Sequence, residues 1–411
     1  MTTTDLLASP ALLATAANPL PLPATLAKPR SFTLDGDPAL ELHLARTCER
    51  VVSGIRGLIP ETKLEAILLG GGYGRGEGGV LRGPAGDRPY NDLEFYVAIE
   101  GNRHVNEFRY HRRLEVLGQI LTHLADAEIE FKITSLAELR GGPVSMFSYD
   151  LIAGHRFIWG RGSATHLTGC ERSSSAEAIP PSEATRLLMN RCSGMLFAAS
   201  ELKRDPLTPA GADFIRRNIA KVQLACGDAV LTAGGQYHWS CRERHRRLTR
   251  LTAIERWPCF DTLIWQHAEG VAFKLHPSVG KLSRDALVEL HREVTALAQH
   301  CWLCLEGCRL GRAFPSARAY AEDSGNKLPG WPRLRNFILN LRANHFRLRL
   351  HPNPWWHPRQ RCYRALALLL WEPETLTDPA LRRRLETDLN TPVFTRSEAI
   401  AAYRALWVHV R

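Results

Sequence analysis

The hydrophobic pattern of the first part of the chain predicts helices that alternate with short strands. Apolar residues at every third or fourth position predict a helix over residues 39–58, and a second helix is expected over 105–125. The apolar run 64–69 predicts a buried strand. Residues 91–99 and 128–133 alternate between apolar and polar positions, which is the period of a strand with one buried face. We therefore expect a small mixed sheet with helices.

The remainder of the chain shows only helical patterns. Ser182 follows Pro181 and suits the N-cap of a first helix. The expected helices span 182–203, 210–233, 284–309, 335–350, 361–371 and 397–410. The predicted fold class is α+β, with a small mixed-sheet domain followed by an all-helical C-terminal region.

Changes in composition suggest where these regions begin and end. Residues 1–31 are rich in Ala, Leu, Pro and Thr and lack the basic and apolar blocks of a signal peptide, so we expect a flexible arm. The sheet domain is assigned to 32–162, and the Ser- and Pro-rich stretch 163–181 is expected to be a linker. The helical domain takes 182–411 and could divide near 330–358, where prolines interrupt the helices.

The charge balance favours an anionic partner. The chain has 53 Lys+Arg against 42 Asp+Glu, a net charge of +11, and most of the basic residues are Arg. Arg binds phosphate and carboxylate oxygens with a planar fork, although a genome biased towards Arg codons would give the same excess. No apolar run approaches the length of a membrane helix, and ten irregularly spaced cysteines suggest reduced thiols. We expect a cytoplasmic protein with no membrane association.

A glycine-rich segment next to an acidic strand is the most informative motif. Residues 69–79 contain seven glycines and Arg75, directly after an apolar strand. Glycine lets the backbone approach a ligand closely, and Arg can bind a phosphate. Asp92 and Glu94 then alternate with apolar residues, so both carboxylates face one side of a strand. A phosphate-binding turn beside paired carboxylates suits metal-assisted phosphoryl or nucleotidyl transfer.

This segment resembles the DNA polymerase beta-type nucleotidyltransferase superfamily. Members have an apolar strand, a Gly-Ser or Gly-Gly turn, often an Arg-Gly pair, and then an Asp-x-Asp or Asp-x-Glu strand. The matching positions are Gly71-Gly72, Arg75-Gly76-Glu77 (the Arg-Gly-Glu of bacterial members), Asp92-Leu93-Glu94, and Glu130 for the third carboxylate on a later strand. The turn lacks the serine of the family. The interval from Gly72 to Asp92 is 20 residues and includes an inserted loop.

The resemblance implies a site and an activity. Asp92, Glu94 and Glu130 would be the catalytic carboxylates and would hold Mg²⁺ or Mn²⁺. The residues expected to bind the nucleotide are Gly71, Gly72, Tyr73, Arg75, Gly76, Lys132, Arg191 and Lys221. The enzyme would move a nucleoside monophosphate from a nucleoside triphosphate, for which we expect ATP, to an acceptor hydroxyl with release of pyrophosphate. The acceptor could be a protein, a small molecule or RNA.

Several assignments have alternatives at this point. Glu128 lies on the same strand face as Glu130 and competes for the third ligand position. Lys132 could contact phosphate or simply pair with Glu130, and Arg191 could form an internal salt bridge with Asp228. The whole fold could also be an inactive module that binds RNA or another phosphate-rich partner.

A cysteine cluster near residue 300 invites comparison with a zinc site. Cys301, Cys304 and Cys308 follow a helical spacing and continue an apolar stripe. A single helix cannot easily arrange three thiolates around a tetrahedral ion. We therefore favour core packing for these cysteines.

Overall fold

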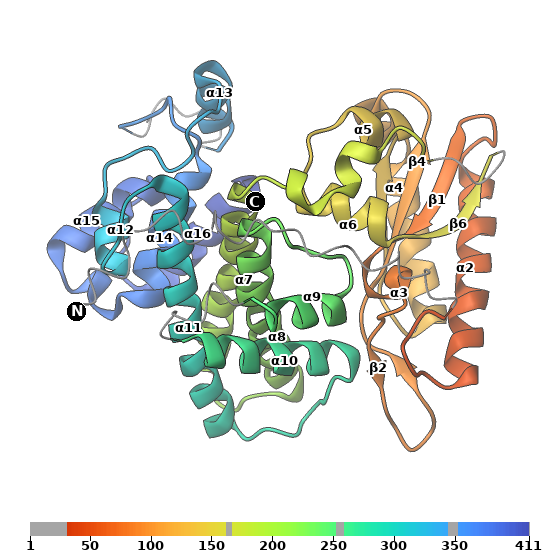
Figure 1. The fold of residues 1–411 in the computed structure, drawn as a ribbon, viewed down its shortest axis with the longest axis horizontal. Helices are drawn as coiled ribbons and strands as arrows, with labels where there is room; N and C mark the ends of the chain where they lie inside the picture. The colour runs from red at the N-terminus through yellow and green to blue at the C-terminus, as the bar shows by residue number, and fades with distance from the viewer. Residues whose placement is uncertain (1–30, 162–166, 252–258, 344–351, 411) are drawn as a thin grey trace.

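The computed structural model describes residues 31–161, 167–251, 259–343 and 352–410. Figure 1 shows a small sheet with its helices on one side of the molecule and a larger assembly of helices on the other. The class is mixed α+β, as predicted. Most of the expected N-terminal arm lies outside the described residues, as does the start of the expected linker. The rest of that stretch contains two short 3-10 helices, over Glu171–Ser174 and Ala176–Ala178.

The N-terminal part contains the elements that the hydrophobic pattern predicted and several more. The elements are α2 (Pro38–Leu58), β1 (Leu64–Leu69), α3 (Gly71–Arg75), β2 (Val80–Leu81), β3 (Arg88–Pro89), β4 (Leu93–Ile99), α4 (Arg103–Ala125), β5 (Ile129–Thr134), α5 (Leu136–Gly141), α6 (Met146–Gly154) and β6 (Arg156–Gly160). The predicted helices and strands of this part are all present, with ends shifted by one or two residues. The elements α3, β2, β3, α5, α6 and β6 were not predicted.

Four strands form one mixed sheet in the order β5-β4-β1-β6. Strand β1 is antiparallel to both β4 and β6, and β4 is parallel to β5. In the parallel pair, Glu94 lies opposite Glu130 and Tyr96 lies opposite Lys132. This register brings two of the predicted ligands side by side on adjacent strands.

The two faces of the sheet are covered by different helices (Figure 1). Helices α2 and α4 pack on one face through a core that includes Leu44, Phe95 and Leu114. Helices α5 and α6 cover part of the opposite face, where Leu151 packs against Tyr96 and its neighbours. The odd-numbered residues of β4 therefore point into the larger core, and Glu94 points to the face of α5 and α6.

The C-terminal part is helical. Its helices are α7 (Ser182–Glu201), α8 (Pro209–Ala233), α9 (Cys241–Leu248), α10 (Phe260–Leu275), α11 (Arg284–Leu310), α12 (Ala317–Glu322), α13 (Arg333–Ala343), α14 (Arg359–Trp371), α15 (Pro379–Leu389) and α16 (Arg396–Val410). A continuous apolar core runs through α7, α8, α11 and α14. Helix α13 corresponds to the helix predicted over 335–350, of which residues 344–350 lie outside the described residues. Helices α9, α10, α12 and α15 were not predicted. Over the described ranges, no helix combines the length and the apolar character needed to cross a membrane.

Candidate metal and nucleotide site

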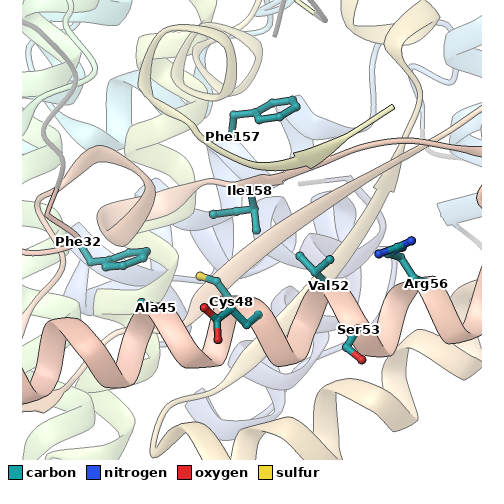
Figure 2. Close-up of a pocket in the computed structure, with 9 residues that line it drawn as sticks. Phe32, Ala45, Cys48, Val52, Ser53, Arg56, Phe157 and Ile158 are labelled. Atoms are coloured by element: carbon teal, nitrogen blue, oxygen red, sulfur yellow. The ribbon is translucent and has the colours of Figure 1, made fainter. Parts of the chain in front are cut away.

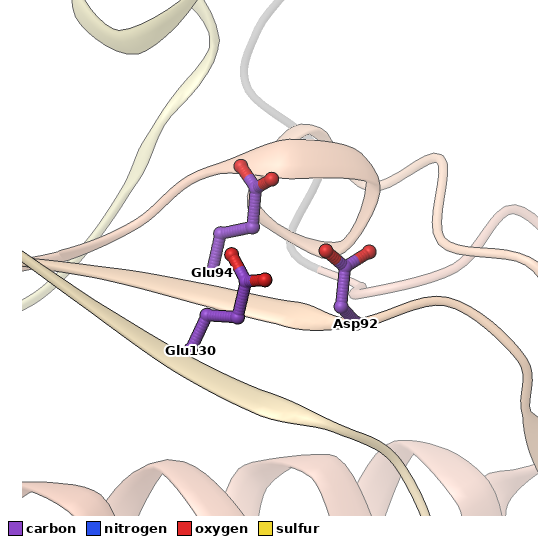
Figure 3. A group of neighbouring side chains, drawn as sticks. All are labelled: Asp92, Glu94 and Glu130. Atoms are coloured by element: carbon purple, nitrogen blue, oxygen red, sulfur yellow. The ribbon is translucent and has the colours of Figure 1, made fainter. Parts of the chain in front are cut away.

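Three carboxylates meet on one side of two neighbouring strands. Asp92 immediately precedes β4, and Glu94 lies within it, so the two-residue period of the strand turns both side chains to the same face. Glu130 comes from β5, directly opposite Glu94. Figure 3 shows the three carboxylates pointing into a common space. The two acids predicted from β4 and the preferred third acid thus converge.

The donor set fits a hard divalent cation. One carboxylate oxygen from each of the three residues lies within 4.8 Å of the other two. Carboxylate oxygens are the ligands that Mg²⁺ and Mn²⁺ prefer. Across the described parts of the chain, this is the one group of acidic, His or Cys side chains close enough to hold a metal ion. Glu128 is exposed and does not belong to the group, so the geometry favours Glu130 over it.

Lys132 lies between two of the carboxylates. Its Nζ is 3.2 Å from Oε1 of Glu94 and 3.1 Å from Oε2 of Glu130. The Tyr96 hydroxyl donates a hydrogen bond of 3.1 Å to the other oxygen of Glu94. The charge-partner interpretation of Lys132 therefore describes this structure. Tyr96 was not among the predicted residues, although its place on the face of Glu94 follows from the same two-residue period.

The charges of the cluster shift its pKa values in opposite directions. Burial raises the pKa of Asp92, and the negative charges of Glu94 and Glu130 raise it further. Burial alone would also raise the pKa of Glu94, but the charge and hydrogen bond of Lys132 outweigh it and lower this pKa. Lys132 offsets the repulsion between carboxylates at Glu94. A further cation beside Asp92 would offset the repulsion that Asp92 experiences from Glu94 and Glu130.

The glycine turn lies against the acidic cluster. Helix α3 begins at Gly71, whose φ of 61° lies in the left-handed region that favours glycine. A Cβ at this position would lie 3.5 Å from Oε2 of Glu94, so the turn and the carboxylate are in contact distance. The first-turn N–H groups of α3, from Gly71 and Gly72, have no acceptor within the helix. These two glycines are therefore placed to approach a phosphate that is bound beside the carboxylates.

Three residues predicted to bind the nucleotide have well-defined structural roles in the protein. The Arg75 guanidinium pairs with Asp150 at 2.8 Å and donates to the Trp239 carbonyl at 3.1 Å, so it is not a free phosphate fork. Tyr73 is fully buried, and its hydroxyl donates to the Gly79 carbonyl and accepts from a backbone N–H. Gly76 has a left-handed φ of 73° at the C-cap of α3.

Two predicted nucleotide-binding residues of the helical part differ from these three in exposure and contacts. Arg191 on α7 and Lys221 on α8 are solvent-exposed, and neither forms an ion pair or hydrogen bond with any described residue. The expected alternative partner of Arg191 is already engaged, because Asp228 pairs with Arg244 at 2.6 Å and with His267 at 3.2 Å. Both predicted cations are therefore available to a ligand.

The charges of Asp92 and Glu94 act on the pKa values of both cations. Burial and the positive charges of Arg191 and Arg217 lower the pKa of Lys221, while Asp92 and Glu94 act in the opposite sense. Burial also lowers the pKa of Arg191, against the same two carboxylates. Solvent reaches both side chains although surrounding protein desolvates them.

The chain matches no family model, no curated protein and no solved structure.

Polar contacts hold the helical part against the sheet near this site. Tyr90 lies two residues before Asp92 in the sequence, and its hydroxyl donates a hydrogen bond of 2.6 Å to Asp213 of α8. The buried carboxylate of Glu77, just beyond the glycine turn, accepts from the Ser240 hydroxyl at 2.6 Å and from the Cys241 N–H at 2.8 Å at the start of α9. These contacts join α8 and α9 to the segments that flank the carboxylates.

Two other features do not contribute to this site. A recess between α2 and β6 (Figure 2) is lined by apolar residues together with Glu49, Ser53 and Arg56, on the sheet face opposite the carboxylates. Cys301 is buried in the helical core, as the core-packing interpretation predicted, and Cys304 and Cys308 are half-buried beside it.

Proposed function

We propose that the chain is a metal-dependent nucleotidyltransferase that moves a nucleoside monophosphate from a nucleoside triphosphate to an acceptor hydroxyl. The observation that carries the proposal is the convergence of Asp92, Glu94 and Glu130 beside the Gly71 turn. A P-loop would need a Lys-Ser or Lys-Thr pair after the glycines, which this segment lacks.

The three carboxylates fit Mg²⁺ or Mn²⁺ because they supply clustered hard oxygens. Burial and the charges of Glu94 and Glu130 raise the pKa of Asp92, and a cation would relieve the repulsion. Asp92, Glu94 and Glu130 would hold the metal. When bound, the metal supplies Lewis-acid activation of the acceptor hydroxyl and neutralises the leaving pyrophosphate.

The protein's own groups would do the rest by positioning. The free N–H groups of Gly71 and Gly72 would bind oxygens of the triphosphate, and Arg191 and Lys221 would bind its outer charges from the helical side. The acceptor oxygen would attack the α-phosphorus, the bond to the bridging oxygen would break, and pyrophosphate would leave. Glu130, whose side chain is 40% exposed, is the group we assign to receive the hydroxyl proton.

The proposal can be tested by pyrophosphate release from each labelled triphosphate in the presence of Mg²⁺ or Mn²⁺. Asp92→Asn should lower the rate by at least about a hundredfold, because it removes a charge that acts on the developing transition state. Glu128→Gln is the matched control, since Glu128 lies two residues from Glu130 but outside the cluster. Undiminished release by Asp92→Asn would refute the assignment. RNA binding that survives both chelation and this substitution would favour the inactive binding module.

The acceptor can be found by mass spectrometry. Candidate proteins, small molecules and RNA ends that gain the mass of a nucleoside monophosphate, only with the unsubstituted protein and metal, would identify the class.

A further inference from the structure

The ammonium group of Lys132 bridges two of the three candidate metal ligands. Its Nζ lies 3.2 Å from Glu94 and 3.1 Å from Glu130, and 5.5 Å from the centre of the Tyr96 ring. Among the ion pairs of the described residues, Asp92 is the one member of the cluster without a cationic partner. A positive charge therefore already lies where the site would bind its ion.

The contacts do not lock the side chain in place. The Lys132 side chain is 41% exposed, and its partner Glu130 is 40% exposed. Lysine has a flexible stem with several rotatable bonds, so its ammonium can leave the carboxylates without disturbing the sheet. The three carboxylates carry three negative charges, and Lys132 lowers this total to two.

We propose that Lys132 and the divalent ion are alternative occupants of the space between Glu94 and Glu130. This inference rests on the proposed function for the presence of the ion. Without nucleotide, the ammonium neutralises the pair and weakens binding of the ion. When nucleotide and ion bind together, the ammonium turns away from the carboxylates and contacts a phosphate oxygen. The charge-partner and phosphate-binding roles of Lys132 are then two states of one side chain.

A consequence is that ion and nucleotide bind cooperatively. The nucleotide offers Lys132 a second anionic partner, so it lowers the cost of removing the ammonium from the carboxylates. By linkage, the ion must raise nucleotide affinity by the same factor. A site with three carboxylates and no lysine would instead bind the ion tightly by itself.

The experiment measures Mn²⁺ binding by the loss of the free-ion signal in electron paramagnetic resonance. Without nucleotide, Lys132→Met should bind Mn²⁺ about tenfold or more tightly than the unsubstituted protein, because a positive charge next to the ion is gone. Lys63→Met is the matched control, since Lys63 pairs with the exposed Glu100 away from the cluster. Asp92→Asn should abolish the binding. Addition of a non-hydrolysable nucleoside triphosphate should tighten Mn²⁺ binding more in the unsubstituted protein than in Lys132→Met.

Thermal unfolding gives an independent readout. Lys132→Met should unfold at a lower temperature without metal, because Glu94 and Glu130 then repel each other, and Mn²⁺ should restore stability. Lys132→Gln serves as a second variant and should behave in the same way. Should Lys132→Met not fold, Lys132→Gln carries both measurements.

The outcomes separate the two levels of the proposal. Mn²⁺ binding that depends on Asp92 but is equal or weaker in the Lys132 variants would overturn the role of Lys132 and leave the metal site intact. An absence of Asp92-dependent binding in every variant would overturn both.

Discussion

The buried carboxylate of Glu77 should be a main connection between the sheet and the helical part. Its oxygens accept one hydrogen bond of 2.6 Å from the Ser240 hydroxyl and one of 2.8 Å from the Cys241 N–H, and the side chain lies at the start of α9. A negative charge at a helix N-terminus is further stabilised by the helix dipole. We therefore expect Glu77→Ala to weaken the attachment of α9 to the glycine segment.

The size of the effect follows from these contacts. A hydrogen bond to a charged group contributes about 1.5–3 kcal/mol, and a buried N–H left without an acceptor costs about 1–3 kcal/mol. Cys241 is 0% exposed, so water cannot easily replace the lost carboxylate. We expect Glu77→Ala to lower the free energy of unfolding by about 3–5 kcal/mol. Glu77→Gln keeps an acceptor oxygen but no charge, and should cost about 1–2 kcal/mol.

The effect should depend on pH with a definite sign. Burial would raise the pKa of Glu77, but Lys274 and the hydrogen bonds from Ser240 and Cys241 outweigh it and lower the pKa. A carboxyl whose pKa is lower in the folded state stabilises the protein above its unfolded pKa of about 4.3, and this contribution is lost as the pH falls through the folded pKa. The difference between Glu77→Ala and the unsubstituted protein should be full at neutral pH and should shrink in acid.

Two measurements test this prediction. Urea unfolding gives the stability, and the transition of Glu77→Ala should separate into two steps if the parts no longer unfold together. Hydrogen exchange of the segment 240–248 reports directly on the N–H groups at the start of α9, which should exchange faster. Glu289→Ala is the control, because Glu289 forms an exposed pair with Arg292 and should change stability by less than about 1 kcal/mol. Stability within about 0.5 kcal/mol of the unsubstituted protein, with unchanged exchange, would refute the reasoning.

Two further predictions concern the ligand side of the site. Arg191→Met and Lys221→Met should each weaken nucleoside triphosphate binding by about five- to thirtyfold in a fluorescence titration at low salt, because each removes one charged contact. Arg204→Met is the control and should not weaken binding, because Arg204 pairs with Glu201. Equal losses in all three variants would indicate a nonspecific charge effect. Gly71→Ala should lower the free energy of unfolding by about 1–2 kcal/mol in urea, because its φ of 61° is strained for any residue with a Cβ, and an unchanged stability would contradict this backbone conformation.

The sequence was sufficient for the carboxylate pair because a strand has a short and regular period. Asp92 and Glu94 flank Leu93, whose burial fixes the opposite orientation for both acids. The choice between Glu128 and Glu130 needed more, since both lie on the same strand face. Only the parallel register, which places Glu130 opposite Glu94, distinguishes them.

Partners that are distant in the sequence account for what the local pattern did not predict. Arg75 looked like a phosphate ligand because Asp150, its ion-pair partner, lies 75 residues away. Helix α10 was missed because Gln266 and His267 interrupt its apolar stripe. Both are buried and satisfied by another helix: Gln266 by Gln223 at 2.5 Å, and His267 by Asp228 at 3.2 Å. No local pattern can reveal that a buried polar residue has a partner elsewhere.

The separation of opposite charges across the site is the strongest argument for a ligand that carries both. Arg191 and Lys221 lie within electrostatic reach of Asp92 and Glu94, yet they form no ion pair with them in the described chain. Hydrogen bonds of Tyr90 and Glu77 join the helices to the sheet part beside these groups. A cation alone would leave the basic residues without partners, and a polyanion alone would be repelled by the acids. A metal-bound triphosphate satisfies both sides, so chelation should release the nucleotide, whereas a binder of RNA that used only the basic surface would be insensitive to it.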